Sequence, residues 1–170
     1  MLNFLNKKLN TTANIIWNAG GSSFYLFACW ITTVLVVILA NGYAQSGALA
    51  VAMATGNLYA TIVLFKSRTV QVSDVKSEFS TDDFLYSKIF TIGIGVIFCL
   101  IYCVLTVSLE KYFVVLLYII FRTCDCIVDV FHGIDQNHNR LDFAGISFIL
   151  RGVFIIVGFS IGLVCFNSLE

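Results

Sequence analysis

The hydrophobic pattern of this chain consists of five long apolar runs separated by short polar segments. The runs cover roughly residues 13–40, 44–65, 84–107, 112–132 and 143–167. Each reaches the length of about 20 residues that a helix needs to cross the hydrocarbon core of a bilayer. We therefore predict an all-α fold: a polytopic bundle of about five transmembrane helices, forming a single domain over residues 1–170.

Composition supports a membrane protein. Hydrophobic residues make up 59% of the chain and charged residues 12%, whereas a soluble domain carries about 25% charged residues. The formal net charge is zero, so no charge excess indicates a nucleic-acid partner. All six cysteines lie in apolar runs without paired metal-site spacing, and we interpret them as small packing residues. We expect no disulfide framework, no metal and no cofactor.

The polar connections contain typical helix-start residues. Three of these connections cover residues 66–83, 108–111 and 133–142. Ser80 or Thr81 is suited to cap the third helix, and Asp142 is suited to cap the fifth. The connection at 66–83 is the longest and most charged, and 108–111 predicts a tight turn.

Basic residues predict the orientation. With the N-terminus in the cytoplasm, seven of them lie on or near the cytoplasmic side: Lys7, Lys8, Lys66, Arg68, Lys76, Lys88 and Arg140. Only Lys111 then lies outside, which fits the positive-inside rule. The C-terminus is therefore expected outside. Because five is an odd number of spans, we also expect the chain to be the front part of a longer protein.

Small residues predict close helix packing in two runs. They recur at every fourth position in the second run, at Ala48, Ala52, Gly56 and Ala60. Gly158 and Gly162 repeat this spacing in the fifth run. Such spacing lets a neighbouring membrane helix approach the backbone closely.

The fourth run carries four ionisable residues on one helical face. Arg122, Asp125, Asp129 and His132 are three, four and three residues apart, which confines them to an arc of roughly 80° at 100° per residue. A charge facing lipid at mid-membrane costs about 2.5–3.5 kcal/mol or more. This polar stripe must therefore face protein or a water-filled cavity.

Two interpretations of the polar stripe overlap. In one, Arg122 and Asp125 form an internal ion pair that locks the bundle. In the other, the stripe lines a hydrophilic pathway for ions or a charged substrate. Arg151, within the fifth run, could pair with Asp125 or Asp129, or bind an anionic substrate, since guanidinium suits phosphate. A metal on the two aspartates and His132 is geometrically compatible, but no other span supplies a second acidic cluster.

Two loop segments resemble a known transporter family. SRTVQVSDVKSEFSTDDF follows the second run, and DVFHGIDQNHNRLDFAGISFILRG joins the fourth to the fifth. Together with the opening NIIWNAGGSSFYLFACWITTVLVVILA, they resemble bacterial O-antigen (Wzx-type) lipopolysaccharide flippases of the multidrug/oligosaccharidyl-lipid/polysaccharide superfamily. The resemblance covers about residues 10–165.

This resemblance implies a location, a fold and a substrate. The chain would form an incomplete N-terminal lobe of a MATE-like transporter in the bacterial cytoplasmic membrane, with the second lobe missing. The whole protein would flip an undecaprenyl-pyrophosphate-linked oligosaccharide by alternating access, often coupled to an ion. The candidate pathway residues are Arg122, Asp125, Asp129, His132, Arg151, Asn14 and Asn18. No enzymatic activity is implied.

Three other functions are compatible with these residues. A cation-coupled multidrug exporter of the same superfamily would use Asp129 as its membrane acid. A membrane prenyltransferase would hold magnesium on Asp125 and Asp129, but would need a second Asp-rich motif. A non-catalytic membrane subunit is the third alternative.

Overall fold

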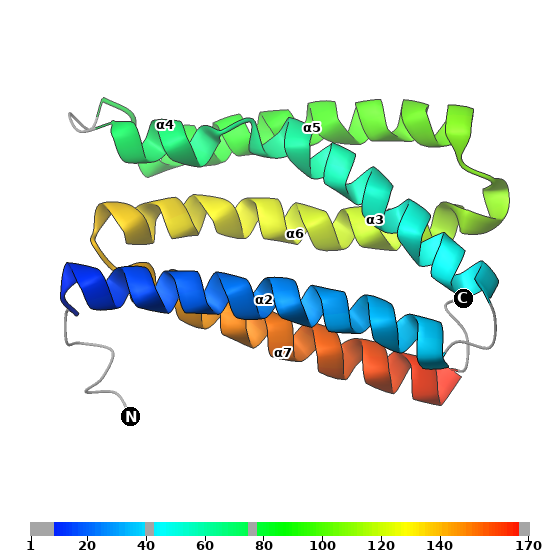
Figure 1. Cartoon of the computed structure of the whole chain (residues 1–170). Coiled ribbons are helices and arrows are strands. Elements are labelled where there is room, and N and C mark those ends of the chain that lie inside the picture. Colours follow the sequence, from blue (N-terminus) through cyan, green and yellow to red (C-terminus); the bar gives the residue numbers. More distant parts are fainter. Residues whose placement is uncertain (1–8, 40–42, 75–77, 167–170) are drawn as a thin grey trace.

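The protein is an all-α polytopic helix bundle, seen here in a computed structural model that describes residues 9–39, 43–74 and 78–166. Five long helices run roughly side by side (Figure 1). They are α2 (Thr11–Leu39), α3 (Tyr43–Leu64), α5 (Thr81–Thr106), α6 (Tyr112–Asn137) and α7 (Leu141–Phe166). A short helix, α4 (Ser67–Ser73), and a 3₁₀ turn, η1 (Leu109–Lys111), complete the described elements. The described residues contain no strand.

α6 lies between two helix pairs. On one side α2 packs along α7, and on the other α3 packs against both α5 and α6. A hydrophobic core joins α3, α5 and α6, with Tyr59 and Val63 fully buried against Cys99 and Val115. The central position of α6 places its side chains between the two pairs.

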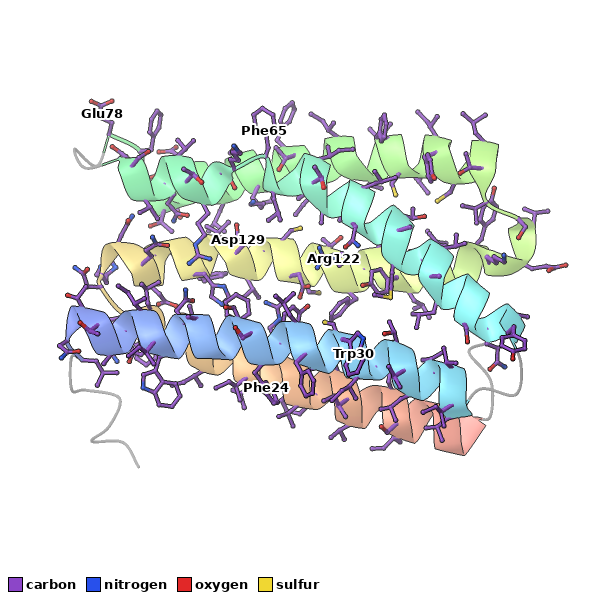
Figure 2. All side chains as sticks on the ribbon, in the orientation of Figure 1. Phe24, Trp30, Phe65, Glu78, Arg122 and Asp129 are labelled. Atoms are coloured by element: carbon purple, nitrogen blue, oxygen red, sulfur yellow. The ribbon has the colours of Figure 1, made fainter. Side chains whose placement is uncertain are left out.

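The outer surface of the bundle is apolar. Large hydrophobic side chains such as Leu26, Phe90, Leu105 and Phe154 are more than two-thirds exposed. Figure 2 shows side chains projecting outward all along the helices, with Trp30 and Phe65 among those labelled. Four of the described segments are long and apolar enough to cross a membrane: Thr11–Leu39, Tyr43–Ser73, Thr81–Thr106 and Leu141–Gly162. Exposed apolar surface of this extent marks a lipid-facing protein, so the chain is a multi-pass membrane protein.

α6 falls outside this group of four because of its charges. Every 18-residue stretch of α6 contains Arg122, Asp125 and Asp129. The helix nevertheless runs alongside the other four over most of their length (Figure 1). We infer that it crosses the bilayer as a fifth span whose charged side faces the interior of the bundle.

The two ends of the bundle differ. α4, the start of α2 and the turn between α6 and α7 share one end, here named the α4 end (Figure 1). Asn14 of α2 donates to the backbone oxygen of Asn139 at 2.7 Å, and the backbone N–H of Asp142 donates to Asn14 at 3.3 Å. Asn14 therefore ties α2 to the α6–α7 turn. The opposite end, named the η1 end, holds η1.

The predicted N-cap is present at the start of α5, whereas the residue predicted to cap α7 makes a different contact. Ser80 caps α5, accepting from the backbone of Asp83, whose carboxylate accepts from the Ser80 backbone in return. Asp142 instead accepts from Nε and Nη2 of Arg140, both at 3.1 Å. These hydrogen bonds raise the pKa of Arg140, so the guanidinium group stays charged.

Two predicted connections are partly helical. α6 continues to Asn137 rather than ending near residue 132, and α4 lies within the segment 66–83 that we predicted as a loop. Asp135 and Gln136 suit a helix that has left the membrane, so the apolar run underestimates its length. Residues 108–111 form a tight turn, as predicted.

The close helix contacts include one predicted glycine and two that were not predicted. Among the described residues, a Cβ on Gly158 or Gly162 would meet nothing within 4 Å, so the close packing predicted there is not found among them. A Cβ on Gly21 of α2 would overlap the backbone of Gly145 of α7. The α2–α7 crossing therefore depends on this glycine pair. In α3 the prediction holds at Gly56, which lies against Tyr118 of α6.

Candidate functional site

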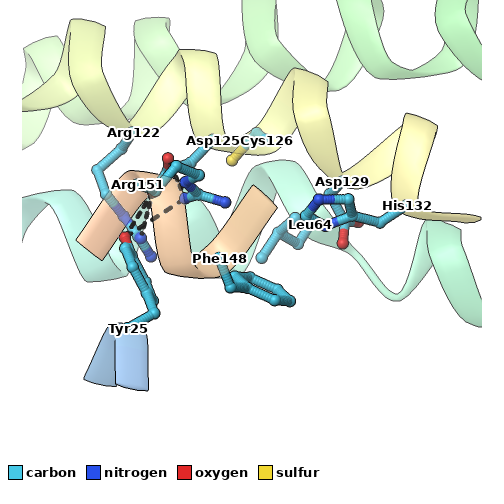
Figure 3. Close-up of a pocket in the computed structure, with 9 residues that line it drawn as sticks. All are labelled: Tyr25, Leu64, Arg122, Asp125, Cys126, Asp129, His132, Phe148 and Arg151. Carbon is cyan, nitrogen blue, oxygen red and sulfur yellow. Dashed lines mark hydrogen bonds and ion pairs between the residues drawn. The ribbon is translucent and has the colours of Figure 1, made fainter. Parts of the chain in front are cut away.

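Asp125 is the centre of an ionic cluster that joins three helices. It accepts from Arg122 Nη1 at 3.1 Å on its own helix and forms an ion pair with Arg151 of α7. Tyr25 of α2 donates to Asp125 at 3.2 Å and accepts from Arg151 at 3.3 Å. Figure 3 shows these four side chains converging. The Arg122–Asp125 ion pair that we predicted is thus present, and Arg151 pairs with Asp125 rather than with Asp129.

The cluster carries excess positive charge. One carboxylate faces two guanidinium groups, and the guanidinium carbon of Arg151 lies 4.7 Å from the centre of the Tyr25 ring. The charged side chains are only partly shielded, since Arg122 and Arg151 keep about a fifth of their side-chain surface exposed. A stack of this kind orients an arginine while leaving some of its donors free.

Asp129 lies one turn further towards the α4 end. Its nearest cation is Arg68 of α4, whose Nη1 lies 3.7 Å from the Asp129 carboxylate. Arg68 also donates to Gln136 at 3.0 Å. Sequence patterns did not indicate this pair, because Arg68 lies in a segment that we predicted as a loop.

His132 completes the polar stripe. Its side chain is 3% exposed, and its ring centre lies 4.8 Å from that of Phe148 on α7. Within the described part of the chain its Nε2 has no hydrogen-bond partner, and the same holds for Asn18 Oδ1 and Arg122 Nε. Since buried polar atoms are normally satisfied, these three atoms favour contact with water or a polar ligand.

A cavity of about 140 Å³ follows the polar stripe between α6 and its neighbours. It is lined by Tyr25, Leu64, Arg122, Asp125, Cys126, Asp129, His132, Phe148 and Arg151. Binding sites for drug-sized ligands measure roughly 300–1,000 Å³. The cavity therefore has room for several waters or one small anionic group, but not for an oligosaccharide.

The predicted pathway residues fall into two groups. Arg122, Asp125, Asp129, His132 and Arg151 all line the cavity. Neither asparagine does: Asn14 is held by the α6–α7 turn as described above, and Asn18 lies a turn further along α2. The position of Asn14 indicates a structural role.

Sequence reasoning missed two polar residues near this site. Lys88 of α5, which we placed near the cytoplasmic surface, is 2% exposed and donates to Ser67 at 2.6 Å. Gln71 of α4 is 4% exposed and donates to the backbone oxygen of Val130 at 3.3 Å. The position of Lys88, two turns into an apolar helix, was the available signal for burial.

Cysteines and carboxylates give no metal centre within the described ranges. No three His, Cys, Asp or Glu side chains there come close enough together to hold a metal ion. Cys99, Cys103 and Cys126 are buried packing residues of the core, while Cys124 is exposed on the outer face of α6. The side chain of Cys165 lies outside the described residues.

The fold and the site define an all-α multi-pass membrane protein with a charged interior. Comparison with known proteins adds no closer assignment: no protein-family model, no curated protein and no solved structure matches the chain.

Proposed function

We propose that this chain is part of a transporter that flips a lipid-linked oligosaccharide across the bacterial cytoplasmic membrane. The observation that carries the proposal is the Asp125 cluster, where two arginines share one carboxylate beside a cavity inside the bundle. A purely structural ion pair needs one cation for each anion. The second arginine supports a role in binding an anion.

The chemistry of the cluster favours phosphate. Guanidinium presents its donors as a fixed fork that matches two phosphate oxygens. Arg122 Nε is buried without a partner in the described residues, so it has a donor to offer. A pyrophosphate that links a lipid to a sugar carries the charge that this cluster would complement.

The size of the cavity favours separate binding places for the phosphate group and the glycan. At about 140 Å³ it accommodates a phosphate group rather than a glycan. We propose that the cluster forms one wall of a larger central space, closed by a second lobe like that of the family the sequence resembles. The sugar would occupy that space, and the lipid tail would stay in the bilayer beside the apolar outer surface.

The proposal also includes the orientation of the bundle in the membrane. The α4 end, which carries Lys66, Arg68 and Arg140, would face the cytoplasm, and the η1 end would face outside. The cargo would then enter from the α4 end.

Deletion of the gene in its bacterial host tests this function. We expect lipid-linked oligosaccharide to accumulate in the inner leaflet and surface polysaccharide to fall, with recovery when the gene is restored. Normal surface polysaccharide in the deletion strain would contradict the proposal. Unchanged polysaccharide combined with sensitivity to cationic drugs would instead indicate the multidrug exporter of the same superfamily.

A further inference from the structure

We infer that α4 is a hinged cover over the α4 end of the cavity, latched by the Arg68–Asp129 ion pair. The inference does not require the cargo to be a glycan. Four features of α4 carry it: its hinge, its anchor, its polar underside and its position beside Asp129.

The hinge lies between α3 and α4. Phe65 and Lys66 have φ angles of 33° and 52°, in the left-handed region that non-glycine residues rarely adopt. The chain changes direction at these two residues. Backbone conformations of this kind concentrate at switch regions, and here they separate a long membrane helix from a two-turn helix.

The hinge side of α4 is anchored. Lys88 donates to Ser67, the first residue of α4, at 2.6 Å, and Thr91 donates to the backbone oxygen of Val63 at 3.1 Å. Both anchoring residues belong to α5. They hold the elbow in place, so α4 can swing about its first residue without releasing α3.

The contacts of α4 with α6 are polar. Gln71 is the only buried residue of α4; it donates to the backbone oxygen of Val130, and Asn137 donates to the Gln71 backbone oxygen at 3.1 Å. Val70 is 53% exposed. Val72 is the one partly buried apolar residue of α4. Opening α4 therefore exposes mainly groups that water can satisfy, which is the property of an element that opens easily.

The latch is beside the cavity. Asp129 lines the cavity, and Arg68 reaches it at 3.7 Å from above the last turns of α6. Gly133 lies under Gln71, where an added Cβ would overlap the Gln71 amide. When Arg68 and Gln71 lift away, Asp129 and His132 gain access to water from the α4 end.

Chemical labelling of Cys126 tests the cover. Cys126 lines the cavity, is 1% exposed, and shares the tryptic peptide 123–140 only with Cys124. The Cys124→Ser variant is reconstituted in lipid nanodiscs and treated with a small water-soluble methanethiosulfonate. Mass spectrometry of the peptide then gives the rate at which Cys126 is modified. This rate reports how often α4 opens. Cys124 is exposed, so its replacement leaves the core intact.

We expect Arg68→Gln to speed Cys126 labelling roughly fivefold, since one partly exposed ion pair shifts an equilibrium by that order. Gly133→Ala should also speed it, by displacing Gln71 without changing charge. Thr69→Ala, on the exposed side of α4, is the matched control and should label at the parent rate. The charge exchange of Arg68→Asp with Asp129→Arg should restore slow labelling.

Labelling at the parent rate in both Arg68→Gln and Gly133→Ala would overturn the cover. This readout does not involve transport. Faster labelling in a chain whose deletion leaves surface polysaccharide unchanged would support the cover and contradict the proposed function, so the two ideas fail separately.

Discussion

Arg151 of α7 and Asp125 of α6 form an ion pair across the interface of two helices that are adjacent in the sequence. Within the described residues α7 packs mainly against α2 and makes few contacts with α6. This ion pair is therefore a principal link between α7 and the central helix. Tyr25 bridges the two charges from α2. The pair therefore connects the α2–α7 layer to the rest of the bundle.

The two partners of this pair should respond differently to neutralisation. Asp125→Asn leaves Arg122 and Arg151 close together without a counter-charge. We expect the free energy of unfolding to fall by about 2–4 kcal/mol, slightly less than for breaking a fully buried ion pair. Arg151→Gln leaves Asp125 with Arg122 and Tyr25, so the loss should be about 1 kcal/mol. Thermal unfolding of the purified variants in detergent measures both. Equal losses, or a larger loss for Arg151→Gln, would show that Arg122 does not compensate.

The α2–α7 crossing should depend on one of two consecutive glycines. In Gly21→Ala the new methyl group meets the Gly145 backbone, which cannot move aside as a side chain could, so we expect a loss of at least about 1–3 kcal/mol. Gly20→Ala is the matched control: a Cβ there meets no described atom within 4 Å, and alanine favours a helix over glycine by about 0.8–1 kcal/mol. We therefore expect Gly21→Ala to lower the unfolding temperature and Gly20→Ala to raise it. Similar shifts in both variants would argue against the close crossing.

The topology should place the two ends of α6 on opposite sides of the membrane. We expect Glu110→Cys, in η1, to react with an impermeant thiol reagent added outside whole cells. His138→Cys, exposed after α6, should react only after the cells are opened. The parent chain, with its native cysteines, gives the background. Reaction of both variants from the same side would mean that α6 does not cross the bilayer.

Much of the bundle could be predicted because the bilayer imposes one rule on every long helix. An apolar run long enough to span the membrane becomes a helix, since no water is present to satisfy its backbone. The five predicted runs therefore match the five long helices closely. The short helix α4 could not be found this way, because it is polar and is held by Arg68 and Gln71 through contacts with α6.

The interior of the bundle was predictable only in part. Helical spacing placed Arg122, Asp125, Asp129 and His132 on one face and required that face to be buried. Spacing cannot show which side chains of other helices meet that face, so the pairing of Asp129 with Arg68 was missed. The Gly21–Gly145 contact was missed for the same reason: its two members lie on different helices, and neither belongs to a four-residue repeat.

The central claim is that the charged stripe of α6 serves transport, and double neutralisation tests it most directly. Arg122→Gln with Asp129→Asn removes one cation and one acid from the stripe. Glu110→Gln with Lys111→Gln removes the same charges from the η1 turn, away from the cavity. In the deletion strain, with each variant introduced into the whole gene, we expect the first pair to abolish export of surface polysaccharide and the second to restore it, at equal amounts of protein in the membrane. Full export by the variant with Arg122→Gln and Asp129→Asn would contradict the account.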